Sequence, residues 1–351
     1  MKVAPLARVL AARQDARHII VHTGQHYDVG MSASFFDDLG IPEPDHNLGV
    51  GSASHAQQTA AIMQRIEPVL EETRPDITIV YGDVNSTVAA ALVAAKLGIR
   101  VAHVEAGLRS RDWTMPEEIN RVVTDRLSDL LFTPSRDGND NLGAEGVPPE
   151  RIHFVGNIMI DSLVHALPGA RALNAPSRHA VSGVPYAVVT LHRPSNVDGA
   201  EALAGLFRAL DAIGCDVPVI FPVHPRTRAR IEAAGLRPSP GSDLRLLEPI
   251  GYLEMLGLVE RAALVITDSG GLQEETSYLG VPCLTVRPNT ERPVTCRQGT
   301  NRLVLPNGDA LMAASREALQ SGPRESAGIE RWDGKAADRI VAVLLDGEEY
   351  R

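Results

Sequence analysis

The feature that most constrains this chain is a regular alternation of short apolar segments with longer segments of helical pattern. The short segments are rich in Val, Ile and Leu, which is typical of strands buried on both faces. Repeated strand–helix–strand order predicts parallel sheets with helices on both faces, an α/β fold. The predicted strands are 77–81, 100–104, 130–133, 152–155, 186–191, 217–221, 244–247, 264–267 and 282–286. The predicted helices of the first half are 31–39, 55–73, 87–97 and 116–127.

The chain begins with a predicted helix over 1–13, and a predicted strand over 17–23 follows. An alternating α/β domain ordinarily begins with a strand and a phosphate-binding turn before its first helix. The first strand of a doubly wound sheet is central, so its absence predicts a gap flanked by unpaired strand edges. We therefore expect the natural polypeptide to begin some residues earlier.

The length of 351 residues predicts two domains of ordinary size, each able to bury a core. Segment 168–184 is rich in Pro, Ala, Ser and Arg, and we expect it to be a loose linker between the two series of strands. The predicted domains are therefore residues 1–167 and 168–330. Residues 331–351 follow them, with an amphipathic helix predicted over 335–345.

Composition excludes several classes of function. A net charge of −10 argues against a general nucleic-acid binder and against binding to an anionic membrane surface. The three cysteines fit neither a disulfide framework nor a zinc site, and no Cys/His cluster has the spacing of metal ligands. No apolar run reaches the ~18–20 residues that span a bilayer, and no signal peptide is evident. We expect a cytoplasmic protein that needs neither a metal ion nor another cofactor.

The most informative stretch for function is 264–275, Leu-Val-Ile-Thr-Asp-Ser-Gly-Gly-Leu-Gln-Glu-Glu. It predicts a buried strand, a tight turn at Ser269–Gly271 and a new helix. Glycines allow a close backbone approach to an anion, which the N–H groups and dipole of the helix then bind. Ser269 can cap the helix or donate to a phosphate, and Glu275 can accept the hydroxyls of a ribose. The alternative is an ordinary helix start, with Glu274 and Glu275 complementing the dipole.

Polar residues follow one predicted strand after another, and ligands of open parallel sheets bind beyond the carboxyl ends of the strands. In the first domain these ends are mainly acidic, whereas the second contributes mainly histidines, arginines and the turn at Ser269. We infer that the second domain binds a nucleotide diphosphate and that the first presents carboxylates to a sugar. The strand ends are 23–26, 82–83, 105–109, 192–193, 224–226, 268–271 and 287–292.

Each of these residues also has a structural interpretation. Asp83 could cap a helix, and Glu105 could form a plain ion pair with Arg109. Glu117 and its neighbour Glu118 stand in the first turn of a helix, where acids are common for dipole reasons. His192 and His224 could be hydrogen-bonded structural histidines, and Arg287 and Arg292 could be surface residues. The functional interpretation depends on the coincidence of so many polar and ionisable side chains at the carboxyl ends of the strands.

Eight motifs in order resemble one family, the non-hydrolysing UDP-N-acetylglucosamine 2-epimerases. The resemblance covers essentially the whole chain. It implies two Rossmann-like doubly wound domains that face a cleft, similar to B-type glycosyltransferases, with the C-terminal helix returning to the first domain. It also implies a homodimer and no metal or nicotinamide. The motifs are GQHY (24–27), YGDVNST (81–87), HVEAGLR (103–109), MPEEINR (115–121), TLHRP (190–194), PVHPRT (222–227), TDSGGLQEE (267–275) and TERP (290–293).

The implied reaction inverts C2 of the sugar by eliminating UDP and adding it back, through a glycal intermediate. By motif, Asp83, Glu105 and Glu117 resemble the family's acid/base carboxylates, and His192 resembles the histidine near the diphosphate. The predicted UDP-binding residues are Lys2, Arg109, His192, Ser269, Gly270, Gly271, Glu275 and Arg292. Gln25 and His26 match a candidate effector site, although Tyr27-Asp28 departs from that pattern. The family's first strand and its Gly-Thr-Arg-Pro-Glu loop are not present in the sequence.

The leading hypothesis is therefore an isomerase that interconverts UDP-GlcNAc and UDP-ManNAc for cell-surface polysaccharide synthesis. Close variants act on a UDP-2,3-diacetamido sugar or its uronic acid, or hydrolyse the intermediate to ManNAc and UDP. From other classes, a glycosyltransferase on the same fold and a UDP-sugar-binding protein without turnover remain alternatives. We predict that an epimerase or a glycosyltransferase converts a UDP-sugar, whereas a binding protein leaves it unchanged.

Overall fold

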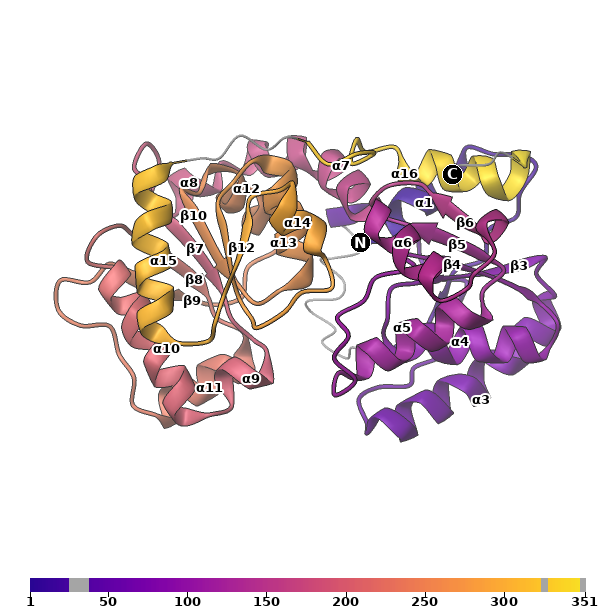
Figure 1. Ribbon diagram of the computed structural model, residues 1–351, viewed down its shortest axis with the longest axis horizontal. Helices are drawn as coiled ribbons and strands as arrows, with labels where there is room; N and C mark the ends of the chain where they lie inside the picture. The colour runs from indigo at the N-terminus through magenta and orange to yellow at the C-terminus, as the bar shows by residue number, and fades with distance from the viewer. Residues whose placement is uncertain (25–37, 323–327, 348–351) are drawn as a thin grey trace. The chain divides into compact units, whose positions relative to one another are not determined.

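The computed structural model describes residues 1–24, 38–322 and 328–347 (Figure 1). The chain divides into two compact units. Unit 1 contains Met1–His165 and Glu330–Arg351, and unit 2 contains Ala166–Ile329. All strand pairs among the described residues are parallel, which confirms the predicted α/β class. The roles predicted for the two domains, and their boundaries, stay predictions.

Unit 2 is built on a six-stranded parallel sheet in the order β12-β11-β10-β7-β8-β9. The chain begins in the middle of this sheet at β7, builds outward to β9, and then returns to place β10 on the other side of β7. This is the doubly wound order of dinucleotide-binding folds, whose ligand crevice forms where the strand order reverses. The strands are β7 (Ala187–Thr190), β8 (Val219–Pro222), β9 (Leu244–Leu247), β10 (Leu264–Thr267), β11 (Cys283–Val286) and β12 (Asn301–Val304).

Alternate residues of these strands pack on opposite faces, as the pleat requires. Val189 and Ile266 contact helices α10 (Ala200–Ile213) and α15 (Gly308–Ser321) in one apolar cluster. Val188 and Val265 belong to a second cluster, with α12 (Tyr252–Arg261) and α13 (Gly270–Leu279) on the other face. Figure 1 shows these helices around the sheet. Both faces are thus buried, and only the sheet ends remain for a ligand.

In unit 1 the described strands form two parallel sheets. The larger has the order β3-β4-β5-β6, and the smaller pairs β1 with β2. The carboxyl ends of β3 and β4 are therefore neighbours, so their polar residues come together. The strands are β1 (Val21–His22), β2 (His46–Asn47), β3 (Ile77–Tyr81), β4 (Arg100–Val104), β5 (Leu130–Thr133) and β6 (Ile152–Phe154).

The larger sheet of unit 1 is also covered on both faces. Helix α1 (Val3–Ala11) and the late helix α16 (Ala336–Val341) share one apolar cluster with Val104 and Phe132. Helices α3 (His55–Thr73) and α4 (Asn85–Lys96) pack on the opposite face. A carboxylate from α7 (Ile158–Leu173) fixes α16, because Asp161 accepts hydrogen bonds from the amides of Ala336 and Ala337 at 3.1 and 2.7 Å. The last helix therefore belongs to the core of unit 1.

The remaining elements are short or lie at the surface. The 3₁₀ turn is η1, and η2 is a π-helical continuation of α16. In the described part of the chain, no helix is both long enough and apolar enough to cross a membrane. The elements are α5 (Pro116–Leu127), α6 (Arg136–Ala144), η1 (Pro149–Arg151), α7 (Ile158–Leu173), α8 (Ala175–Arg178), α9 (Pro194–Val197), α11 (Pro225–Ala233), α14 (Pro293–Arg297) and η2 (Ala342–Asp346).

Two sequence expectations differ from the structure, and one strand was not expected. The segment expected to be a loose linker is largely helical, since α7 continues through Pro168 to Leu173 and α8 follows. The strand expected over 17–23 pairs only at Val21–His22, and β12 was not predicted. Most of the helix expected over 31–39 lies outside the described residues.

Candidate functional site

The reversal point of the unit 2 sheet carries a histidine and an aspartate in contact. His192 follows β7 and Asp268 follows β10, and these strands are hydrogen-bonded neighbours. His192 Nδ1 lies 3.0 Å from Asp268 Oδ1. The other carboxylate oxygen accepts the backbone amides of His192 and Arg193 at 3.0 and 2.9 Å and the side-chain amide of Asn196 at 3.0 Å. Asp268 thus fixes both the loop and the ring.

Asp268 is fully buried, yet its environment favours the carboxylate. Burial alone would raise the pKa of Asp268, but His192 and the surrounding hydrogen bonds lower it below its usual value. Nδ1–H of His192 therefore donates to the carboxylate, which leaves Nε2 as the reactive nitrogen. The His192 side chain is 47% exposed, so that nitrogen can reach a ligand. Asp268 was within a predicted motif, but its contact with His192 was not foreseen.

The Ser-Gly-Gly turn opens helix α13 beside this pair. The helix begins at Gly270, where its first amides have no partner within the helix. Ser269 is the N-cap residue of α13, as expected, but its side chain makes no capping hydrogen bond, and its backbone amide donates to Thr267 Oγ1 at 2.9 Å. A Cβ atom at Gly270 would lie 2.7 Å from Arg292 Nη1. Glycine is therefore required here because a guanidinium approaches the start of the helix.

Arg292 belongs to a buried ionic cluster and is not a surface residue. Its Nε lies 2.8 Å from Glu274 Oε1, and its Nη1 pairs with Glu291. Arg287, also buried, lies 2.8 Å from the second oxygen of Glu291. Two arginines thus balance two glutamates, which is what a buried cluster needs to be tolerated. The structural interpretation of Arg287 and Arg292 as surface residues is wrong, while the UDP contact of Arg292 stays a prediction.

Glu275 lies on α13 and is almost fully buried. Tyr252, at the start of α12, donates its hydroxyl to Glu275 Oε1 at 3.0 Å. Burial raises the pKa of Glu275 to about 7, and the neighbouring Glu274 adds to the rise. This carboxyl group can therefore gain or lose a proton near neutral pH. Tyr252 was not predicted, because nothing in its local sequence pattern separates it from an ordinary core residue.

In unit 1, Glu105 occupies a strained position directly after β4. It has φ of +76°, in the left-handed region that residues other than glycine rarely adopt. It is buried, and its Oε2 contacts Nζ of Lys2. A Cβ atom at Gly82 would lie 3.1 Å from that same oxygen. The ends of β3 and β4 therefore bring Lys2, Gly82 and Glu105 together, and such strain is typical of functional positions.

Asp83 and the first turn of α5 are joined by one arginine. Arg121 pairs with Asp83 through Nη2 and with Glu118 through Nη1. Glu118 is buried and also accepts the amides of Ser110 and Arg111 at 2.9 and 2.8 Å. Glu118 therefore has a structural role. Its neighbour Glu117 is half-buried and has no such set of contacts in the described chain, which leaves it available for chemistry.

Arg109 is also tied into unit 1. It pairs with Asp125 at 2.7 Å and makes a bidentate contact with Glu145, with both distances 2.7 Å. It lines a cavity of about 470 Å³ together with Arg111, Trp113 and Arg126. This engagement favours a structural role for Arg109, and its contact with UDP stays a prediction.

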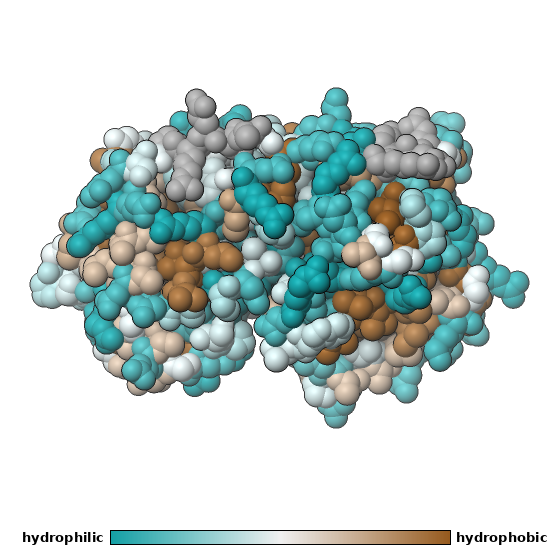
Figure 2. Space-filling view, in the orientation of Figure 1, coloured by the Kyte–Doolittle hydropathy of each residue, from teal (hydrophilic) through white to brown (hydrophobic). Residues whose placement is uncertain are grey.

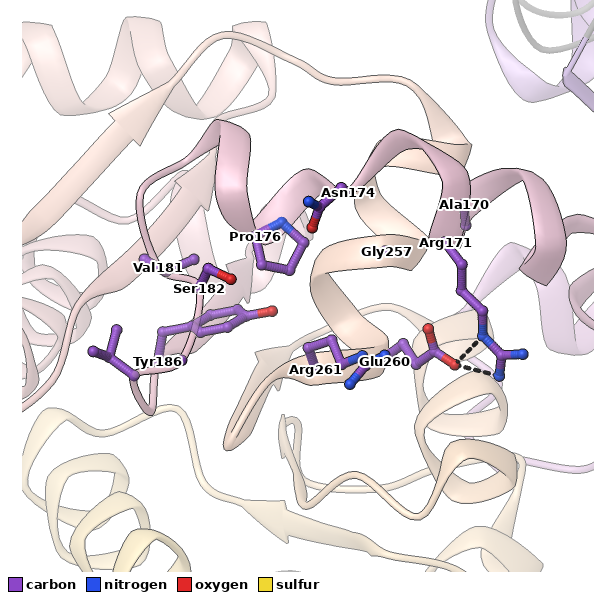
Figure 3. Close-up of a pocket in the computed structure, with 12 residues that line it drawn as sticks. Ala170, Arg171, Asn174, Pro176, Val181, Ser182, Tyr186, Gly257, Glu260 and Arg261 are labelled. Atoms are coloured by element: carbon purple, nitrogen blue, oxygen red, sulfur yellow. Dashed lines mark hydrogen bonds and ion pairs between the residues drawn. The ribbon is translucent and has the colours of Figure 1, made fainter.

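A second cavity, of about 420 Å³, lies in unit 2 (Figure 3). Tyr186 and Val181 line it together with Glu260 and Arg261 of α12, and Glu260 is bonded to Arg171 at 2.6 Å. Tyr186 precedes β7 and Arg261 precedes β10, so this cavity lies at the amino ends of the strands. The predicted residues follow the carboxyl ends. The cavity is therefore separate from the predicted site.

The candidate effector residues, Gln25 and His26, lie outside the described residues. The structure therefore does not place an effector site. Within residues 1–24, 38–322 and 328–347, no group of three His, Cys, Asp or Glu side chains could hold a metal ion.

Comparison with known proteins assigns the chain to a family. The UDP-N-acetylglucosamine 2-epimerase family model matches residues 8–345. The chain belongs to this family. It is 41% identical to UDP-N-acetylglucosamine 2-epimerase of Methanocaldococcus jannaschii over 99% of this chain and 96% of the relative. It is 42% identical to UDP-2,3-diacetamido-2,3-dideoxy-D-glucuronate 2-epimerase of Pseudomonas aeruginosa, over 98% of this chain and 96% of that relative.

Solved structures of other epimerases share the fold. The crystal structure of the M. jannaschii UDP-GlcNAc 2-epimerase in complex with UDP-GlcNAc and UDP aligns with a TM-score of 0.88, at 41% identity over 99% of this chain and 96% of that one. The Neisseria meningitidis UDP-GlcNAc 2-epimerase bound to UDP-GlcNAc also aligns with a TM-score of 0.88, at 28% identity over 98% of this chain and 96% of that one. The family resemblance expected from the eight motifs is thus confirmed.

Proposed function

We propose that this epimerase-family chain interconverts UDP-GlcNAc and UDP-ManNAc without hydrolysing them. The observation that carries this proposal is the group of acids at one edge of unit 1. Glu105 is strained and buried, Asp83 is oriented by Arg121, and Glu117 stands exposed enough to act beside them. Inversion at C2, the carbon that carries the acetamido group, needs acids and bases on more than one side of the ring. We propose these three acids for that role.

The proposed reaction has two balanced halves. A carboxylate takes the proton from C2, a C1–C2 double bond forms, and the C1–O bond breaks with its electron pair leaving on UDP. UDP then adds back to C1 while a carboxylic acid protonates C2 from the opposite face. Positioning is essential because the C2 proton is only weakly acidic. Asp83, Glu105 and Glu117 are assigned to these proton transfers.

Unit 2 is assigned to the nucleotide. The hydroxyl of Ser269 and the amides of Gly270 and Gly271 bind the diphosphate at the start of α13, where the helix dipole favours an anion. Glu275 binds the ribose hydroxyls, and His192 stabilises the charge that grows on the departing UDP. Arg292 and Lys2 are assigned further contacts with UDP. No metal ion or nicotinamide takes part in this scheme.

Product analysis tests the proposal. Incubation with UDP-GlcNAc should give a mixture with UDP-ManNAc, with no acceptor required. Release of free ManNAc and UDP would instead indicate the hydrolysing reaction, and UDP release that depends on an acceptor would indicate a glycosyltransferase. Binding without any turnover would reduce the chain to a UDP-sugar-binding protein.

A second substrate has specific support. The diacetamido-uronate epimerase from P. aeruginosa is 42% identical to this chain, as similar as the M. jannaschii relative at 41%. Overall identity therefore does not separate the two substrates. Turnover of UDP-GlcNAc and of the UDP-2,3-diacetamido uronic acid, measured side by side, assigns the substrate by the ratio of kcat/KM.

We further propose that the protein is a homodimer, as the family resemblance implies, and that it is located in the cytoplasm. Apolar side chains gather on the surface over α5 (Figure 2), where Ile119 and Val123 are 46% and 38% exposed. Trp113, just before α5, is 63% exposed. Exposed apolar patches often mark protein interfaces. Light scattering of the purified protein tests this assembly, and a mass of one chain would contradict it.

A further inference from the structure

His103 lies inside unit 1 between two hydrogen-bond acceptors. It is on β4, two residues before Glu105, and its side chain is fully buried. Nδ1 lies 2.6 Å from Asp125 Oδ1. Nε2 lies 2.8 Å from the backbone carbonyl oxygen of Gly82. Both ring nitrogens are thus engaged, so the protonation of the ring follows from its two partners.

A carbonyl oxygen can only accept, so Nε2 must carry a proton. At Nδ1 there are two choices: the ring donates to a carboxylate, or a protonated Asp125 donates to a neutral ring. The second oxygen of Asp125 already accepts the amide of Gly107 at 3.1 Å and Nη1 of Arg109 at 2.7 Å. These two donors, one of them a guanidinium, favour the carboxylate.

The charges around the ring are compatible with the same state. Arg109 pairs with the buried Asp125 and with Glu145, whose side chain is 42% exposed. A protonated His103 makes these four groups neutral together. Burial opposes ionisation of Asp125, but the charges of His103 and Arg109 bring its pKa below the usual value.

We infer that His103 is a buried imidazolium that acts as a positioning residue for the proton-transferring carboxylates. Its two N–H groups contact Gly82 and Asp125, and Asp125 in turn accepts the amide of Gly107. Gly82 directly precedes Asp83, Gly107 is two residues beyond Glu105, and Asp125 is on α5, whose first turn carries Glu117. One cation thus sets the spacing of the turns that bear all three acids.

The protonation state is tested on the unaltered protein. Nitrogen-15 labelling of histidine and two-bond correlation NMR distinguish an imidazolium, with both nitrogens protonated, from either neutral tautomer. At neutral pH His103 should show the imidazolium signature. A neutral tautomer there would overturn the inference. The His103→Gln spectrum identifies the resonance among the 11 histidines.

The positioning role, which depends on the proposed function, is tested by kinetics. Gln can replace the Nε2–H donor to Gly82 but not the contact with Asp125, whereas Asn can replace the Nδ1–H donor alone. We expect His103→Gln, His103→Asn and Asp125→Asn each to lower kcat on the order of 10²-fold with little change in KM, because small displacements of reacting groups have effects of that size. His165→Gln, at an exposed histidine of α7, is the matched control.

A double variant separates positioning from general damage. If His103 acts through Asp125, then His103→Gln combined with Asp125→Asn should be no slower than the worse single variant. The positioning role would be overturned if the double variant showed the product of the two single losses in kcat. It would also be overturned if His103→Gln had the same kcat as the control. Absence of turnover in the unaltered protein would instead overturn the proposed function, while the NMR result would still decide the charge of His103.

Discussion

Asp268 Oδ1 lies 3.0 Å from Nδ1 of His192, at the point where the strand order of unit 2 reverses. The two residues are 76 positions apart in sequence, and parallel pairing of β7 with β10 brings them together. A buried carboxylate behind a half-exposed histidine fixes the tautomer and the direction of the ring. We therefore regard Asp268 as the positioning partner of His192.

This relationship predicts the effect of Asp268→Asn. An amide in place of the carboxylate can present a donor to Nδ1 and so select the wrong tautomer, in which Nε2 carries a proton instead of a lone pair. We expect kcat to fall by ~10²-fold or more, as in other carboxylate–histidine pairs. Steady-state kinetics at neutral pH measures it. Asp198→Asn, at an exposed ion pair with Arg226, is the control, and equal activity of the two variants would contradict the pairing.

Substitutions of the adjacent glutamates of α5, Glu117 and Glu118, should have different effects on activity and stability. Glu117→Gln should lower kcat by ~10²–10⁴-fold, the range for loss of a general acid or base, and leave stability unchanged. Glu118→Gln should lower the free energy of unfolding by on the order of 3 kcal/mol, because it leaves Arg121 buried with one partner fewer. Denaturant unfolding and turnover assays on both variants test this. A large stability loss in Glu117→Gln would place the functional role elsewhere.

Glu275 predicts a pH-dependent affinity for UDP. The carboxylate form accepts ribose hydroxyls, and burial raises the pKa of Glu275 to about 7. Affinity should therefore weaken as pH falls below about 7, by at most about tenfold per pH unit. Calorimetric titration with UDP between about pH 6 and pH 8 tests this. UDP itself titrates near pH 6, so Glu275→Gln supplies the baseline. An identical pH dependence in that variant would contradict the ribose contact.

Asp161 predicts a pH-dependent stability of unit 1. Burial raises the pKa of Asp161 to about 6 from 3.8, and Asp338 and Asp333 add to the rise. A raised carboxyl pKa contributes stability at low pH that is lost as pH rises from about 4 through about 6. Relative to Asp161→Asn, the free energy of unfolding should fall across that window by on the order of 2–3 kcal/mol.

Tryptophan fluorescence can report this unfolding selectively. Trp332 is buried and donates its indole N–H to the carbonyl oxygen of Pro134 at 2.9 Å, and Trp113, the other tryptophan, also lies in unit 1. Trp113→Phe isolates the Trp332 signal. A stability difference between the Asp161→Asn variant and its parent that stays the same at every pH would contradict the prediction.

Much of the fold could be predicted because strong local patterns agreed with the tertiary structure. Strands β3, β4, β5, β9 and β10 and helices α3 and α5 have the bounds expected from their apolar periodicity. Strand β12 was missed because Asn301 begins it, and that buried amide is satisfied by Thr285, Gln273 and Thr295 from other elements. Helix α7 was misjudged because composition suggested a linker, although Pro168 removes only one hydrogen bond from an otherwise Ala- and Leu-rich helix.

The positions of the candidate site residues in the fold could be predicted from the sequence, but the contacts between their side chains could not. Asp83 and Glu105 follow neighbouring strands and His192 follows the strand where the order reverses, as the sequence pattern predicted, while their roles stay predictions. The contacts of Arg121 with Asp83, Tyr252 with Glu275 and Asp268 with His192 join residues far apart in sequence. No local pattern encodes them, so they required the structure.

The most direct test of the proposed reaction is proton exchange at C2. Incubation of the protein with UDP-GlcNAc in D2O, followed by proton NMR, should show deuterium at C2 of both UDP-GlcNAc and UDP-ManNAc as the two interconvert. Glu105→Gln should abolish this exchange while binding UDP with nearly the original affinity. Epimer formation with the C2 proton fully retained, or no exchange and no epimer from any UDP-2-acetamido sugar, would contradict the mechanism.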